Sequence, residues 1–150
     1  MTGDAQAQLE GFIDRFTPQV AADARVALAW MEARLPGAIR LVYDNYNALA
    51  IGFSSNAKLS GTFASIALYP RWVSLFLMRG VELPDPAGLL EGGGGRIRHV
   101  KLKDIGRLSD AAVAVLLDAA AAIAEPPLDR DGVGTLVIKS VSPNQRPRRV

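Results

Sequence analysis

The opening of the chain has the apolar spacing of two amphipathic helices. Within residues 4–16, large apolar side chains recur at intervals of three and four, which is the period of one helical face. Thr17 followed by Pro18 predicts the start of a second helix, because threonine caps free backbone amides and proline fits the first helical position. Apolar positions then repeat on one side of this helix until a Pro-Gly pair at residues 36–37 ends it.

The middle of the chain changes to short runs rich in β-branched and aromatic residues. Four strands are predicted, at residues 39–43, 48–53, 62–69 and 72–78. Their connections are too short for parallel crossovers, so an antiparallel meander is predicted. Residues 49–53 and 72–78 are apolar on both strand faces. We therefore expect helices on one face of the sheet, and a further helix, a ligand pocket or a second subunit on the other.

The last third of the chain adds the remaining elements. A loop rich in proline and glycine spans residues 81–95, and a strand is predicted at residues 97–102. A helix capped by Ser109 and a strand at residues 135–141 follow. The predicted fold is a single α+β domain over residues 1–150, with an antiparallel β-sheet of about five to six strands packed with three helices. Residues 142–150 are predicted to be a flexible basic tail.

Composition narrows the classes of function. There is no cysteine, which excludes disulfides, thiolate metal sites and a cysteine nucleophile. Acidic and polar residues occupy the start of the chain, where an export signal would be basic and then apolar, so we expect a cytoplasmic protein without a membrane segment. The net charge of +2 argues against a nucleic-acid partner, although five bases lie between residues 96 and 107 and three arginines lie in the tail. No cofactor is expected.

Three segments carry a resemblance to a known family. The sequences SIALYPRWV at residues 65–73, RHVKL at 98–102 and LVIKSV at 136–141 resemble the YdhG-like family, domain of unknown function 1801, over about residues 5–142. The resemblance implies a small bacterial α+β domain with an antiparallel sheet. It also implies an alternative role as a frataxin-like iron carrier that uses carboxylates on the opening helices. Glu10 and Asp14, four residues apart and on one helical face, are the candidate ligands of that alternative.

Aromatic and polar residues gather at the predicted strand ends. Aromatic rings with polar tips beside arginines can line a pocket for a small anion. The candidate ligand-binding residues are Tyr43, Asn45, Tyr69, Arg71, Trp72, Arg98 and His99. His99 is the only histidine and no partner for it can be identified, so no nucleophile and base pair is recognisable and the chain is not expected to be an enzyme. The favoured function is non-enzymatic binding of a small anionic ligand or of a partner, with a homodimer as one form of the latter.

Overall fold

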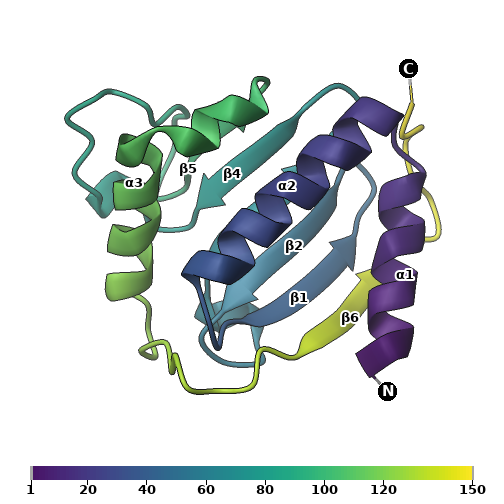
Figure 1. Cartoon of the computed structure of the whole chain (residues 1–150), viewed down its shortest axis with the longest axis horizontal. Coiled ribbons are helices and arrows are strands. Elements are labelled where there is room, and N and C mark those ends of the chain that lie inside the picture. Colours follow the sequence, from purple (N-terminus) through teal and green to yellow (C-terminus); the bar gives the residue numbers. More distant parts are fainter. Residues whose placement is uncertain (1, 150) are drawn as a thin grey trace.

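A computed structural model describes residues 2–149 and has an α+β fold. The helices and strands follow one another as α1 (Thr2–Asp14), α2 (Pro18–Arg34), β1 (Ile39–Asp44), β2 (Leu49–Ser54), β3 (Thr62–Leu68), β4 (Val73–Leu77), β5 (Arg98–Leu102), α3 (Ala111–Ala122) and β6 (Leu136–Val141). Single turns of 3-10 helix, η1 (Leu59–Gly61), η2 (Gly80–Glu82) and η3 (Ile105–Ser109), occupy the loops. Figure 1 shows the three α-helices in front of one six-stranded sheet.

The sheet has the strand order β5-β4-β3-β2-β1-β6. The antiparallel meander predicted for the middle of the chain is confirmed, because β1 to β5 are antiparallel neighbours. The predicted α+β fold, with three helices and a mostly antiparallel sheet, is confirmed. The last strand departs from the antiparallel pattern, since β6 pairs with β1 in parallel. The chain leaves the β5 edge, passes through α3 and returns at the opposite edge. This long crossover permits a parallel pair, whereas the short turns of the meander do not.

The hydrophobic core lies between the sheet and the helices. One row of side chains crosses five strands and is fully buried: Val42, Ile51, Ile66, Leu75 and Val100. Buried residues of α1, α2 and α3 belong to the same cluster as this row, so all three helices pack on one face of the sheet (Figure 1). β2 and β4 both lie inside the sheet, as the sequence predicts.

The helix boundaries follow local capping chemistry. Thr17 caps α2 as predicted, because its hydroxyl accepts the backbone N–H of Val20 at 3.3 Å. For α3 the predicted cap is wrong by one residue. Ser109 belongs to η3, and the carboxylate of Asp110 accepts the backbone N–H of Ala112 at 2.9 Å.

The opposite side of the sheet, here called the open face, is built differently. Two rows of paired residues lie on it: Tyr43, Ala50, Ala67, Ser74 and Lys101, and beside them Leu41, Gly52, Ser65, Phe76 and His99. Small side chains therefore form the middle, and larger ones stand at the margins. Among the described residues no helix packs on this face. A further helix was one of the three covers expected from the sequence, and it is not found there. No helix within residues 2–149 is long and apolar enough to cross a membrane.

Candidate functional site

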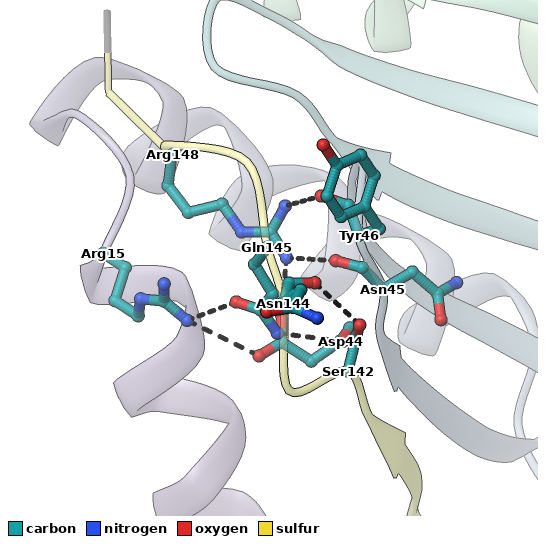
Figure 2. A network of polar contacts seen from close by, with 8 residues as sticks. All are labelled: Arg15, Asp44, Asn45, Tyr46, Ser142, Asn144, Gln145 and Arg148. Carbon is teal, nitrogen blue, oxygen red and sulfur yellow. Dashed lines mark hydrogen bonds and ion pairs between the residues drawn. The ribbon is translucent and has the colours of Figure 1, made fainter.

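A buried carboxylate, that of Asp44, lies at the end of β1 and close to the C-terminal residues of the chain. Asp44 is in the core-facing row with Leu49 and Leu68, and only 1% of it is exposed. A buried charge needs a partner. Arg148 supplies it, donating from Nη2 to Oδ1 of Asp44 at 2.9 Å and to the carbonyl of Asn45 at 2.6 Å. Figure 2 shows this guanidinium in contact with the carbonyls of Asn45 and Tyr46, in the turn that follows β1.

Further contacts fix residues 142–149, here called the C-terminal segment. Arg149 donates to the carbonyls of Asp14 and Arg15, both at 3.1 Å, at the C-terminal end of α1. Gln145 accepts from Arg15 at 2.6 Å and donates to the Asp44 carbonyl at 3.0 Å (Figure 2). The C-terminal segment, predicted to be a flexible basic tail, is therefore held against α1 and the turn after β1 by Gln145, Arg148 and Arg149. Residue 150 lies outside the described residues.

Docking of the C-terminal segment forms one wall of a hollow at the end of the sheet. The turn between β1 and β2 and the turn between β3 and β4 form the other walls. The hollow has a volume of about 640 Å³ and is bounded by Asn47, Tyr69, Pro70, Trp72, Arg146 and Pro147. We call it the turn pocket. Its walls come from three parts of the chain that are far apart in sequence.

Two stacked rings form the aromatic wall of the turn pocket. The centroids of Tyr69 and Trp72 are 4.8 Å apart and their planes differ by 18°. The Trp72 indole N–H donates to the hydroxyl of Ser74 at 3.0 Å, and this hydrogen bond fixes the ring on the open face. Burial raises the pKa of the Tyr69 hydroxyl, so this group stays neutral at physiological pH. The wall is therefore a rigid, uncharged stacking surface.

Two cations lie near the aromatic wall: Lys101 beside Trp72, and Arg146, which bounds the same pocket. The Lys101 ammonium is 5.6 Å from the centroid of Trp72, and the Arg146 guanidinium is 5.8 Å from the centroid of Tyr46. Both distances suit cation–π attraction. Within the described part of the chain, neither cation forms an ion pair with a carboxylate. Their charge is consequently available to an anion.

The predicted site residues are brought together only in part. Tyr69 and Trp72 line the turn pocket. Tyr43 lies on the open face beside Ala50, where burial raises its pKa. Asn45 and Arg71 are exposed in the two turns, and the Asn45 carbonyl is used by the C-terminal segment.

The two predicted residues on β5 lie on opposite faces of that strand. His99 is on the open face, tilted against Phe76 with ring centroids 5.3 Å apart. Arg98 pairs with Leu77 on the other face and donates to the carbonyl of Ile97 at 2.9 Å. Arg98 therefore does not belong to the site.

Sequence reasoning missed the contributions of Arg146, Pro147 and Lys101. The first two were assigned to a solvated tail, and the signal that could have corrected this is Asp44, the one acid of the strand IRLVYD at residues 39–44. Its partner is 104 positions away, so no local spacing reveals the pair.

Another hollow, of about 200 Å³, lies between the start of β3 and the end of α3. Its main cation, Arg79, donates to both carboxylate oxygens of Glu82 at 2.7 Å and to the carbonyl of Ile123 at 2.7 Å. This guanidinium is saturated by structural partners, which leaves the turn pocket as the stronger candidate.

The carboxylates of the iron alternative do lie together. The guanidinium of Arg25 joins them, at 2.9 Å from Glu10 and 2.7 Å from Asp14. The same contacts raise the pKa of Arg25. Both acids are thus occupied by a cation of the protein, and the described residues contain no group of three or more histidine, aspartate or glutamate side chains placed to hold a metal.

Comparison with known proteins returned no family model, no curated protein and no solved structure that matches this chain. The candidate site is therefore defined by its own geometry.

Proposed function

We propose that this chain is a non-enzymatic binding protein that holds a small, flat, anionic ligand in the turn pocket. The observation that carries the proposal is the stacked pair of Tyr69 and Trp72, with the unneutralised cations Lys101 and Arg146 beside it. A volume of about 640 Å³ lies within the range of pockets for small molecules, which combine aromatic walls with a few polar groups.

Each wall supports one part of the ligand's chemistry. A flat ring placed on the aromatic wall would gain about 0.5–1.5 kcal/mol beyond the burial of its area. The Arg146 guanidinium presents a planar fork of donors, which suits a carboxylate or a phosphate. The Asn47 side chain adds a donor and an acceptor at the rim. Binding without catalysis is supported by the position of His99, which packs on Phe76 outside the residues that bound the pocket.

Three expectations from the sequence remain part of this proposal. They are the cytoplasmic location, membership of the YdhG-like family, and a second copy of the chain as a partner on the open face. The family is supported by the strand segments that carry the resemblance. The partner is supported by the two rows of small side chains in the middle of the open face, on which no helix of the described residues packs.

The experiment uses two carboxylates that differ only in ring shape. In a Trp30→Phe variant, Trp72 is the only remaining tryptophan, so its indole N–H signal in NMR reports on the pocket. Benzoate is expected to shift this signal saturably, and cyclohexanecarboxylate much less. Arg146→Gln should weaken benzoate binding about tenfold, since a hydrogen bond to a charged group contributes about 1.5–3 kcal/mol. Lys58→Gln removes an equal charge from an exposed loop and should have no effect.

Two results would contradict the proposal. If neither carboxylate moves the Trp72 signal at millimolar concentration, the turn pocket is not a ligand site. If both move it equally, the aromatic wall does not select flat rings and that part of the proposal is wrong.

A further inference from the structure

We propose that the turn pocket is one part of a longer track that binds single-stranded nucleic acid across the end of the sheet. The inference rests on the proposed function only in taking the aromatic wall as a ligand surface. The track consists of three rings with cations at both ends: Arg146, Tyr46, Tyr69, Trp72, Lys101, Lys103 and Arg107.

The topology of the sheet places these residues along one end of it, in the order of the strands from β1 to β5. Five paired residues mark that end: Asp44, Leu49, Leu68, Val73 and Leu102. The turn after β1, the turn after β3 and the chain after β5 therefore emerge side by side. Arg146 joins the same end, because its backbone N–H donates to the Tyr46 carbonyl at 2.9 Å.

A second hollow extends the track beyond the turn pocket. It has a volume of about 360 Å³ and is bounded by Glu91, Lys101, Lys103, Asp104 and Arg107. Three cations face two carboxylates here, and Asp104 is used in capping η3, where it accepts the Gly106 N–H at 2.9 Å. Lys101 belongs to this hollow and also lies over Trp72, which bounds the turn pocket. The two hollows thus meet at the contact between Lys101 and Trp72.

This arrangement matches the physical requirements of a single strand. Proteins bind single strands by placing phosphates on cations and unstacked bases on aromatic rings. The track from β1 to β5 crosses four interstrand spacings of about 4.8 Å, so it is about 19 Å long and can contact a few nucleotides. The bases of a duplex are stacked inside it and cannot reach rings that are fixed to a sheet. The structure therefore favours a single strand over a double helix.

The sequence-based expectation against nucleic acid depended on the net charge, and the fold shows how that charge is distributed. The net charge of +2 is a sum over the whole surface, whereas several acids belong to helices on the other side of the sheet: Glu10, Asp14, Asp23, Glu32 and Asp118. The arginines of residues 146–149 have no aromatic neighbours in sequence. The fold brings Tyr46 and Tyr69 to Arg146, and that supplies the missing interleaving.

The test is fluorescence anisotropy with a labelled ten-nucleotide single strand of DNA, measured at two salt concentrations. Trp72→Leu is expected to weaken binding about tenfold, because stacking of one base contributes about 1–3 kcal/mol. The double variant Lys103→Gln/Arg107→Gln should weaken binding. Each phosphate contact contributes about 0.7 to the slope of log affinity against log salt, so the loss of two contacts should reduce the size of that slope by about 1.4. It should leave the benzoate-induced shift of Trp72 unchanged.

The matched control is Lys58→Gln/Arg130→Gln, which removes two exposed cations from outside the track. The inference is overturned if this control weakens binding as much as the track variant does, or if a hairpin duplex binds as tightly as the single strand. A wild-type protein that responds to benzoate but not to the oligonucleotide would refute the track and leave the turn pocket standing. Failure with both probes would refute both proposals.

Discussion

The ion pair between Asp44 and Arg148 should be essential for holding the C-terminal segment in place. Arg148→Met keeps the length and apolar stem of the side chain but removes its charge and its donors. The carboxylate of Asp44, 1% exposed, then loses the Nη2 donor at 2.9 Å. The nearest remaining cation is Arg15, whose Nη1 is 3.7 Å from the other carboxylate oxygen.

The expected cost follows from these distances. Two unit charges at 2.9 Å attract by about 6 kcal/mol at an effective dielectric constant of 20, most of which offsets desolvation. Removing one partner of a buried pair typically costs about 3–5 kcal/mol, because the other charge stays uncompensated. Arg15 compensates part of that charge, so we expect about 3 kcal/mol. In a chain of 150 residues this loss lowers the melting temperature by roughly 6–12 °C.

Urea denaturation of four proteins measures the effect. They are the wild type, Arg148→Met, Asp44→Asn and the double variant. Because the two residues act together, the double variant should cost clearly less than the sum of the single variants. Arg146→Met is the control, since this exposed arginine of the same segment should change stability by less than about 1 kcal/mol. A loss below about 1 kcal/mol for Arg148→Met, or strict additivity in the cycle, would refute the ion pair as the anchor.

Two further predictions concern a turn and a titrating pair. Gly37 has a φ of +86°, and a Cβ there would lie 2.0 Å from the carbonyl oxygen of Asp129, whereas Gly88 has a φ of +66° and open space around it. Gly37→Ala should therefore cost more than about 2 kcal/mol in urea unfolding and Gly88→Ala about 1 kcal/mol; equal costs would show that close approach is unimportant. Hydrogen bonds from Arg79 lower the pKa of Glu82, so this carboxylate stabilises the fold above its unfolded pKa and loses that contribution as pH falls through the folded pKa. Carbon-13 NMR titration should find the lowered pKa, and Arg79→Gln should raise it toward the ordinary glutamate value; an unchanged pKa in the variant would contradict the assignment.

Much of the fold could be predicted from sequence because its signals are local. Thr17 and Pro18 mark a helix start through capping chemistry that involves only the next few residues. The meander of β1 to β4 has turns of a few residues, so period and turn length suffice to predict it. The parallel pairing of β6 could not be found in this way, because neither its orientation nor its neighbour is encoded near residues 136–141.

The candidate site shows the same division between local and distant signals. Tyr69 and Trp72 were identified because both flank one short turn, where aromatic residues are conspicuous. Arg98 was misplaced because strand alternation puts it on the face opposite His99. Arg146 could be assigned only with the whole chain folded, since its place depends on an acid about a hundred residues earlier.

The pairing of β6 with β1 also bears on the order in which the molecule can be assembled. Arg40 is paired with Leu136, so this edge closes a far larger loop than any hairpin of the meander, and its entropic cost is correspondingly larger. A partly folded chain could hold β1 to β4 together and still lack the wall that residues 146 and 147 provide. The affinity of the turn pocket for its ligand would then depend on whether β6 has paired with β1. Local opening of this edge would remove one wall of the pocket and release the ligand while the core stays folded.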